Sequence, residues 1–388
     1  MKLIIDQFLQ KGLDALTRTN FKEAENCYRT ILEMQPDNFN AHNFLGVSLN
    51  ELGRVNEAEV SYKNAIKYKP DFAEAHYNLA VILIKSKKIF EGIKSYQDAI
   101  KYKPDFAEAH YNLGNVLSVI KRLKEAKKSY QDAIKYKPDF PTAHNNLGSI
   151  YLDLGDLKES ELSFKKALSL KQDYIEAKSN IKLISSLKKV LFNIEKEKKT
   201  TAANLKILNP VMKLSPDPFV TNRSVKSNLI NYLYRMNSRK LDETKDSRFG
   251  NGKCSIDFYL FDDDEFIIKS LTKDLVDIMC QAVGTKVQVI DSFFNIIGAG
   301  GGTKPHNHII PFDNAKNLGD QKYSLVYYLS VGDQNCNEPG IFKLYEPNEE
   351  VLPTNGMIMI IPSGRKHSAV YEGKKDRVMV GVNFYLYK

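Results

Sequence analysis

The chain has 388 residues, of which 43% are hydrophobic and 27% charged, and these proportions are typical of soluble globular domains. Its formal net charge is +9, but no motif that reads nucleic acid accompanies this charge, so the sequence does not favour a nucleic-acid partner. No apolar run is long enough to cross a bilayer, and Asp6 interrupts the first apolar run, so we expect no membrane partner and no signal peptide. The four cysteines have no paired spacing, so we expect reduced thiols in a cytoplasmic protein.

The first half of the chain repeats itself every 34 residues. "SYKNAIKYKPDFAEAHYNL" begins at Ser61 and "SYQDAIKYKPDFAEAHYNL" begins at Ser95. Prolines, small residues and histidines recur with the same period, at Pro36, Pro70, Pro104 and Pro138, at Gly12, Gly46, Ala80, Gly114 and Gly148, and at His42, His76, His110 and His144. A fixed period of this length predicts stacked helix pairs, each ended by a proline, with a small residue where two helices approach closely.

These units resemble the tetratricopeptide repeat, from about Phe39 to Asp173, with a weaker unit before them. The segment 174–198 is expected to be a helix that caps the stack, so the first domain spans residues 1–199. The four repeat histidines occupy a packing position of the first helix, and we expect them to be packed rings.

Three asparagines, Asn78, Asn112 and Asn146, follow the same period, and Phe44 interrupts their row. The resemblance implies that this position lines a concave groove, where amide side chains can pair with the backbone of an extended peptide. The alternative is that these asparagines only cap helices or contact solvent.

A lysine-rich stretch that ends at Pro210 separates this half from a second domain, residues 200–388. Helices are expected at about 222–236 and 265–283. From Lys286 onward the sequence predicts strands at "VQVIDSFFNII", "SLVYYLSV", "GIFKLYE", "MIMIIP" and "DRVMVGVNFYLY". Many short strands with turn residues between them favour a β-sandwich or jelly roll with the helices on one face. The expected fold is therefore α+β and multidomain, an α-solenoid followed by a double-stranded β-helix, or jelly roll.

The three remaining histidines, His306, His308 and His367, all lie in this second half. His306 and His308 stand at a strand end in "TKPHNHIIPFD", and residues i and i+2 of a strand point to the same side. His367 follows an apolar strand and a turn, and Arg377 comes ten residues later. A jelly roll brings distant strands together at one end, where the three imidazoles could hold one metal ion.

This pattern resembles the 2-oxoglutarate/Fe(II)-dependent oxygenases, especially their prolyl-4-hydroxylase-like branch, over about Lys206 to Lys388. The resemblance implies that the three histidines bind iron and that Arg377 holds the far carboxylate of 2-oxoglutarate. It also implies that Tyr328, in "VYYL", contacts this co-substrate. Ser324 and Asn383 are further lining candidates, and no catalytic residue beyond the metal ligands is expected.

His308 stands where these oxygenases usually have an acidic ligand, although a subgroup of microbial members has His-x-His. Three neutral imidazoles would leave the full double charge on the iron and loosen its selectivity against zinc, nickel or copper. Asp313 could supply the acid, but its spacing from His306 does not suit one strand face. A further alternative is that only His306 and His367 bind the metal, and another is that the histidines are merely hydrogen-bonded rings at strand ends.

The sequence thus predicts a dioxygenase that uses Fe(II), 2-oxoglutarate and O2, with ascorbate as an optional cofactor. It would hydroxylate a side chain of a polypeptide gathered by the repeats, and a similar pairing of domains in animal collagen prolyl hydroxylases suggests proline as one target. Two rivals stay open: a non-catalytic interaction scaffold with a degenerate oxygenase domain, and a three-histidine, cupin-like dioxygenase acting on a small molecule.

Overall fold

The computed structural model of the chain describes residues 2–203, 218–244 and 247–387. Contacts divide the chain into two compact units. The first comprises Met1–Tyr151 and Leu162–Tyr174, and the second comprises Leu152–Glu161 and Ile175–Lys388. Among the described helices, none is both long enough and apolar enough to span a membrane.

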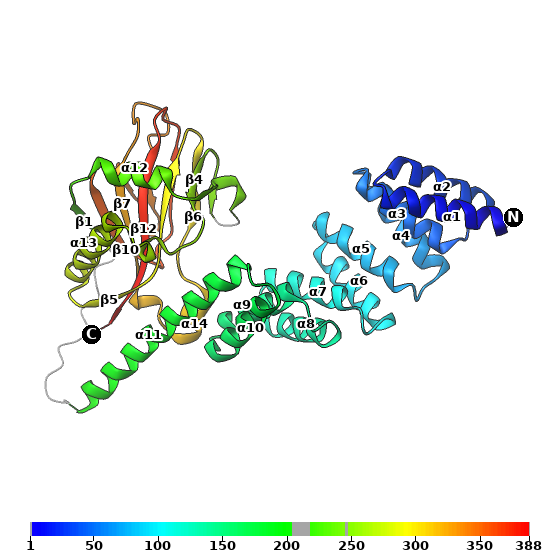
Figure 1. Ribbon diagram of the computed structural model, residues 1–388, viewed down its shortest axis with the longest axis horizontal. Coiled ribbons are helices and arrows are strands. Elements are labelled where there is room, and N and C mark those ends of the chain that lie inside the picture. The colour runs from blue at the N-terminus through cyan, green and yellow to red at the C-terminus, as the bar shows by residue number, and fades with distance from the viewer. Residues whose placement is uncertain (1, 204–217, 245–246, 388) are drawn as a thin grey trace. The chain divides into compact units, whose positions relative to one another are not determined.

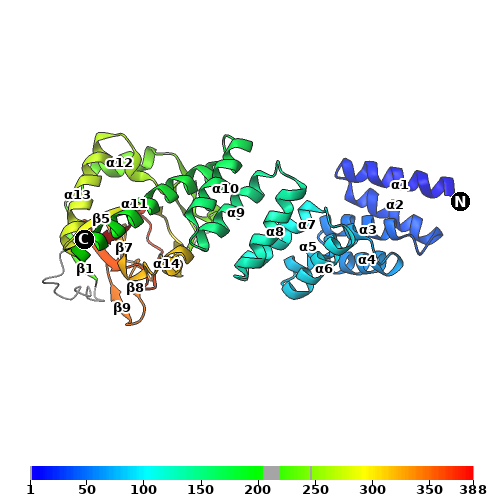
Figure 2. The ribbon, with the colours of Figure 1, turned by 90° about the horizontal axis from the view of Figure 1, so that it is seen from below.

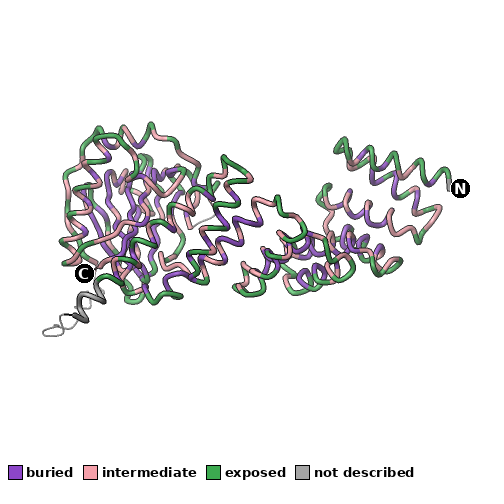
Figure 3. Tube along the Cα trace, turned by 60° about the horizontal axis from the view of Figure 1, so that its bottom comes forward, coloured by how far each residue is buried: buried purple, intermediate pink, exposed green. Residues whose placement is uncertain are grey.

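The N-terminal region is a helical solenoid, as the 34-residue period predicted (Figures 1 and 2). Neighbouring helices pair α1 with α2, α3 with α4, α5 with α6 and α7 with α8. The helices are α1 (Lys2–Thr17), α2 (Phe21–Met34), α3 (Phe39–Glu51), α4 (Val55–Tyr68), α5 (Ala73–Lys85), α6 (Ile89–Tyr102), α7 (Ala107–Val119), α8 (Leu123–Tyr136), α9 (Pro141–Asp153) and α10 (Leu157–Leu170). Buried and exposed residues alternate along each helix, as an amphipathic pattern requires (Figure 3).

The recurrent small residue of each repeat makes room for an aromatic ring of the second helix. A Cβ atom at Gly46 would lie 2.6 Å from the ring of Tyr62, and one at Gly114 would lie 2.8 Å from the ring of Tyr130. The two helices of a repeat therefore pack closely because the aromatic ring of the second helix fills the space above the small residue of the first, and not because their backbones touch.

The repeat histidines are packed rings, as expected. His42 Nε2 lies 2.9 Å from the carbonyl oxygen of Pro36, and its ring stacks on Tyr68 with centroids 5.5 Å apart. His76, His110 and His144 make the same contact with the proline six residues earlier. These four histidines hold the turn between repeats together, and the cluster of potential metal ligands among the described residues does not include them.

Helix α11 (Ile175–Ala203), the expected cap of the solenoid, belongs to the second unit and pairs through Lys188 with Glu161 of α10, so its role as a cap stays a prediction. It contacts β5 and β12, Tyr259 Oη donates a hydrogen bond to the carbonyl oxygen of Ser179, and Lys182 pairs with Asp262 at 3.1 Å. The expected boundary between residues 199 and 200 falls inside this continuous helix, and residues 204–210 of the lysine-rich stretch lie outside the described residues.

The second unit contains two antiparallel sheets. The seven-stranded sheet has the order β1-β10-β7-β12-β5-β4-β2, and the five-stranded sheet has the order β3-β6-β11-β8-β9. The strands are β1 (Phe219–Asn222), β2 (Ser238–Lys240), β3 (Arg248–Phe249), β4 (Gly252–Ser255), β5 (Lys286–Ile297), β6 (Gly301–His306), β7 (Lys322–Ser330), β8 (Phe342–Leu344), β9 (Glu349–Val351), β10 (Met357–Pro362), β11 (His367–Tyr371) and β12 (Arg377–Tyr387). The helices are α12 (Ser227–Arg235), α13 (Phe266–Val283) and α14 (Pro311–Lys316), with short 3-10 turns η1 (Leu241–Glu243), η2 (Leu260–Asp262) and η3 (Gly319–Gln321).

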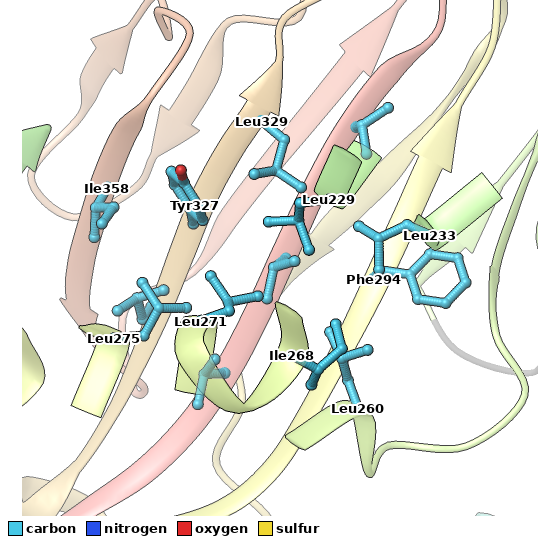
Figure 4. Close-up of a cluster of buried hydrophobic side chains, with 14 of the residues drawn as sticks. Leu229, Leu233, Leu260, Ile268, Leu271, Leu275, Phe294, Tyr327, Leu329 and Ile358 are labelled. Carbon is cyan, nitrogen blue, oxygen red and sulfur yellow. The ribbon is translucent and has the colours of Figure 1, made fainter. Parts of the chain in front are cut away.

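One face of the seven-stranded sheet is covered by α12 and α13, which confirms the two expected helices and their place. Their apolar residues, such as Leu229 and Leu271, form a core with Phe294 and Leu329 of the sheet (Figure 4). The opposite face meets the five-stranded sheet in a second core, which contains Tyr328, Met359 and Met379 from the larger sheet and Phe342, Leu344 and Tyr371 from the smaller one. Each long strand therefore has two buried faces, and the second face is the one that surrounds the candidate site.

Candidate metal centre

The structure brings the three histidines of the second half together. His306 ends β6 and His367 begins β11, and the two are register partners on neighbouring strands. His308 follows the end of β6, where its backbone N–H donates to the carbonyl oxygen of Ser363 at 2.9 Å. One ring nitrogen from each histidine lies within 4.8 Å of the others. The sequence placed His306 and His308 on one strand face, whereas here the loop after β6 turns His308 back toward the other two.

Hydrogen bonds orient two of the rings. His306 Nδ1 lies 2.7 Å from the carbonyl oxygen of Lys304, and His367 Nδ1 lies 3.2 Å from that of Arg365. A carbonyl oxygen can only accept, so each Nδ1 carries the proton and each Nε2 presents a lone pair. His308 Nε2 lies 3.2 Å from His367 Nε2. Imidazoles that ligate a metal are held in the same way, with the far nitrogen donating to a carbonyl or carboxylate.

The environment favours neutral imidazoles. Burial lowers the pKa of His367 to about 4, helped by the charge that His306 would carry. Burial also holds the pKa of His308 well below its ordinary value, and His367 and His306 act in the same direction. The ring of Phe342 stacks on His367 with centroids 5.1 Å apart. Neutral, converging nitrogen donors of this kind suit a divalent transition metal such as iron or zinc.

Asp313, weighed as a substitute acidic ligand, has both carboxylate oxygens engaged elsewhere. Oδ2 accepts the backbone N–H of Ile310 at 2.8 Å and Nζ of Lys322 at 2.9 Å, and Oδ1 accepts the hydroxyl of Tyr385. Asp313 is fully buried. Its carboxylate therefore anchors α14, directly after His308, to β7 and β12, and the alternative that it binds the metal is wrong.

The histidines line a cavity of about 400 Å³ between the two sheets. Apolar side chains form most of its wall, among them Ile290, Phe293, Val326 and Phe342, and Leu183 of α11 contributes to it as well. Of the residues predicted to bind the co-substrate, Tyr328 and Asn383 line this cavity.

Arg377 is fully buried against Tyr328. Its guanidinium carbon lies 4.8 Å from the centroid of the Tyr328 ring, and its Nη1 donates to the carbonyl oxygen of Gly340. Within the described part of the chain, Arg377 Nε, Arg377 Nη2 and Tyr328 Oη have no hydrogen bond of good geometry, although the guanidinium and the hydroxyl are close enough for each to shift the other's pKa. Gly340 has a φ of +80°, and a Cβ atom there would lie 1.7 Å from Arg377 Nη1. A buried cation with two unsatisfied N–H groups is costly, so this spot is suited to an anionic oxygen of a ligand, which would accept their hydrogen bonds.

Ser324 lies behind the cavity wall, in a row of hydrogen bonds across the large sheet. Its hydroxyl donates to Asn383 Oδ1 at 2.6 Å and lies 2.9 Å from the hydroxyl of Ser363. Asn383 Nδ2 in turn donates to Asp291 Oδ1 at 2.7 Å. Ser324 therefore orients Asn383, and Asn383 orients Asp291, which lines the cavity.

Three charged residues in this wall, Asp291, Lys322 and Arg248, were not predicted from the sequence. Burial raises the pKa of Asp291 to about 6, although the Lys322 cation and Asn383 oppose this shift. Arg248 donates to Asn295 at 3.0 Å and lies over the rings of Phe258 and Phe293. A charge inside an otherwise apolar strand run, such as the aspartate of "VQVIDSFFNII", was the available signal.

The predicted groove asparagines link neighbouring repeats. Asn78 Nδ2 donates to Asn43 at 3.0 Å, and Asn112 Nδ2 donates to the hydroxyl of Tyr77 at 2.9 Å. Asn146 Nδ2 donates to Asn115 at 2.9 Å and to the hydroxyl of Tyr111 at 3.3 Å. All three side chains are half-buried. They therefore do more than contact solvent, and their binding of a peptide stays a prediction.

Comparisons with known proteins concern the repeats. A family model described as "TPR repeat" matches residues 46–87, 82–118 and 121–155. Two models described as "Tetratricopeptide repeat" match residues 9–62 and 141–174. Similar solved structures include a MamA protein (24% identity, 54% of this chain and 100% of that chain, TM-score 0.40). They also include PilF of Pseudomonas aeruginosa (20% identity, 52% and 89%, TM-score 0.44) and YrrB, described as "a TPR protein with an unusual peptide-binding site" (18% identity, 44% and 88%, TM-score 0.39). None of the curated proteins matches the chain. The N-terminal region of this chain is thus an array of tetratricopeptide repeats.

Proposed function

We propose that the second unit is an iron(II)- and 2-oxoglutarate-dependent dioxygenase that hydroxylates a side chain of a polypeptide gathered by the repeats. The observation that carries this proposal is the convergence of His306, His308 and His367, with Nδ1 of two rings held by carbonyl oxygens. Such a set leaves metal positions open for a co-substrate, as in other mononuclear non-haem iron sites.

The order of the strands supports a jelly roll. From β5 to β12 the chain alternates between the sheets, except that β8 and β9 are neighbours in the smaller one. Four of these eight strands, β10-β7-β12-β5, lie in the large sheet and four, β6-β11-β8-β9, lie in the small one. Two facing four-stranded sheets with this alternation are typical of a jelly roll, in which the ends of β6 and β11 meet.

The residues present fit the proposed metal and co-substrate. His306, His308 and His367 would hold the iron. The unsatisfied nitrogens of Arg377 and the hydroxyl of Tyr328 would receive the far carboxylate of 2-oxoglutarate, because a guanidinium binds a carboxylate through two parallel hydrogen bonds. When bound, the iron would let dioxygen act as the oxidant, with one oxygen atom going to the substrate as a hydroxyl and the other to 2-oxoglutarate, which would leave as succinate and carbon dioxide.

The protein's own residues would position the substrate and exclude water. The apolar walls around Phe293 and Phe342 would keep the reacting carbon in a dry environment, which strengthens the polar contacts inside. The repeats would deliver the polypeptide, because tetratricopeptide repeats typically bind peptides or proteins. The rival scaffold and the cupin-like enzyme give no role to the unsatisfied pair of Arg377 and Tyr328.

Anaerobic titration of the full chain with Fe(II) and 2-oxoglutarate tests the proposal. We expect one Fe(II) per chain and a weak visible charge-transfer band. His306→Ala and His367→Ala should abolish both, His308→Ala should weaken both, and His308→Asp should retain them because aspartate is also a good iron ligand. His42→Gln, a change to a histidine of the repeats, is the control. If all three alanine variants bind iron as the parent does, the site is wrong, and iron binding without a co-substrate band would favour one of the rivals.

A further inference from the structure

One end of the cavity carries a carboxylate that the proposed function does not use. Asp291 of β5 is the register partner of Asn383 on β12, while Arg377 of β12 is the register partner of Ile297 on β5. Arg377 and Asn383 are six residues apart, or about 20 Å along an extended strand. The cation proposed to hold the co-substrate and the carboxylate of Asp291 therefore lie six residues apart along the same strand pair, Arg377 at one end and Asp291 near the middle.

The histidines and Asp291 lie at similar separations from one turn. Strands β5 and β6 are joined by the turn at 298–300, and Asp291 lies near the middle of β5, six residues before Ile297. His306 is the last residue of β6 and thus also lies several residues from the turn, and its register partner His367 lies beside it. Asp291 and the three histidines all line the one cavity. A substrate that reaches the histidines would therefore pass close to the Asp291 carboxylate.

Asp291 is the one carboxylate among the described residues that line the cavity, beside the cations Lys322 and Arg248. Lys322 and Asp313 form a buried neutral pair at 2.9 Å. Asp291 accepts a hydrogen bond from the neutral amide of Asn383. Within the described residues, Asp291 forms no ion pair, since neither Lys322 nor Arg248, the lysine and arginine that line the cavity, lies within ion-pair distance of it. Buried charges in proteins are normally paired, and one that faces an open cavity can find its partner in a ligand.

The walls next to this carboxylate are apolar. Ile290, Ile309 and Ile310 line the cavity close to Asp291 or His308 in sequence, and Phe293 and Val326 continue the same surface. Apolar walls beside a carboxylate that has no ion pair match a side chain that has a run of methylene groups and a cationic tip.

We infer that Asp291 is a substrate-binding residue, and that the polypeptide side chain entering the cavity is a long aliphatic one with a cationic end, a lysine ammonium or an arginine guanidinium. The inference rests on the proposed function, because it names the substrate of that same site. The substrate residue inferred here, lysine or arginine, differs from the proline that the resemblance suggests, because a proline ring in a polypeptide has no charge to pair with Asp291.

Binding of three capped amino acids to the full chain tests the inference. The probes are Nα-acetyl N-methylamides of lysine, arginine and norleucine, the last being an uncharged analogue of the lysine stem. Each is titrated by calorimetry into anaerobic protein loaded with Mn(II) and 2-oxoglutarate. The parent, Asp291→Asn and Asp320→Asn are compared. Asp320 is exposed and lies outside the cavity lining, so its variant is the control for loss of one negative charge.

We expect lysine or arginine to bind the parent at least ten-fold more tightly than norleucine, and whichever binds more tightly identifies the class of side chain. Asp291→Asn should weaken that probe by about 30-fold or more, the loss typical of removing one partner from a desolvated charge pair, with norleucine little changed. Asp320→Asn should behave as the parent does. Equal binding of all three probes by the parent, or a cation preference that persists in Asp291→Asn, would overturn the inference. Mn(II) and 2-oxoglutarate titrations on the same samples report on the proposed function separately.

Discussion

Arg377 illustrates how one residue can be buried, charged and still incompletely bonded. It makes one hydrogen bond, to Gly340, and its Nε and Nη2 find no partner among the described residues. Natural proteins rarely leave buried donors unpaired, and those that persist often mark a ligand site. The arrangement makes Arg377 the residue that separates the oxygenase most sharply from its rivals.

Substitution of Arg377 should reduce affinity for 2-oxoglutarate and leave the metal in place. Arg377→Lys keeps the charge but loses the two-pronged geometry, so we expect weaker binding of the co-substrate. Arg377→Ala should weaken it further, by about 1.5–3 kcal/mol, the usual contribution of a hydrogen bond to a charged group. Calorimetric titration of 2-oxoglutarate into anaerobic, metal-loaded protein measures both. Equal affinity in parent and Arg377→Ala would show that this arginine does not bind the co-substrate.

Asp291 should make the stability of the free protein depend on pH. Burial raises its pKa from 3.8 to about 6, so the folded chain holds this proton more tightly than the unfolded chain does. Stability is therefore lost as the pH rises through about 6. Asp291→Asn should remove that loss and stabilise the protein at pH 7.5 by up to roughly 3 kcal/mol, with a gain that fades below pH 5.

Urea unfolding of the metal-free protein at pH 5, 6 and 7.5 measures this difference. Asp320→Asn again serves as the control for the change in net charge. A stability difference that does not vary with pH would mean that the pKa of Asp291 is the same in the folded and the unfolded chain.

At the scale of elements, the asparagine row joins neighbouring helix pairs of the solenoid. Asn112 bonds Tyr77 and Asn146 bonds Tyr111, in each case one repeat back along the chain. Solenoids are stabilised by contacts within repeats and between nearest neighbours, so a ladder of side chains between repeats contributes directly to their stacking. The groove asparagines therefore have a structural role whether or not they also bind a peptide.

The triple change Asn78→Ala, Asn112→Ala and Asn146→Ala should lower the stability of the solenoid. The three side chains donate four hydrogen bonds, and each lost bond contributes about 0.5–1.5 kcal/mol, so the sum is about 2–6 kcal/mol. Thermal unfolding followed by circular dichroism reports this loss, and capture of a validated peptide partner at a temperature where the variant is folded reports on binding. If the variant captures the peptide partner as well as the parent does, these asparagines only stabilise the stacking of the repeats and do not bind the peptide.

At the scale of the whole molecule, α11 packs on the sheets of the second unit and also pairs, through Lys188, with Glu161 of α10. Tyr259 and Asp262 bond to α11, and its Leu183 lines the cavity. A fragment of residues 152–388 should therefore unfold in one cooperative transition. A fragment that begins at residue 200 lacks this wall and should be aggregation-prone or only partly folded. Both fragments are expressed, and their unfolding is measured by calorimetry. A well-folded 200–388 fragment would show that the sheets fold without α11.

Much of this architecture could be predicted because it depends on patterns among residues that are close together in the sequence. The 34-residue period determined the helix pairs, since each helix packs mainly on its neighbours in the chain. The longest strands, β5, β7 and β12, were predicted from their β-branched and aromatic residues. Strand β11 was not among the expected strands, because a run of five residues with a histidine and a serine has no distinctive alternation.

The sequence by itself also singled out the three histidines and Arg377 as the chemically unusual residues of the second half. Only the tertiary structure decided how they meet, because register between strands is set by pairing of distant segments. It made His367 the neighbour of His306, engaged both oxygens of Asp313, and packed α11 on β5. It also exposed Asp291 to the cavity, since which face of a strand borders an open space depends on the opposite sheet and not on the strand's own residues.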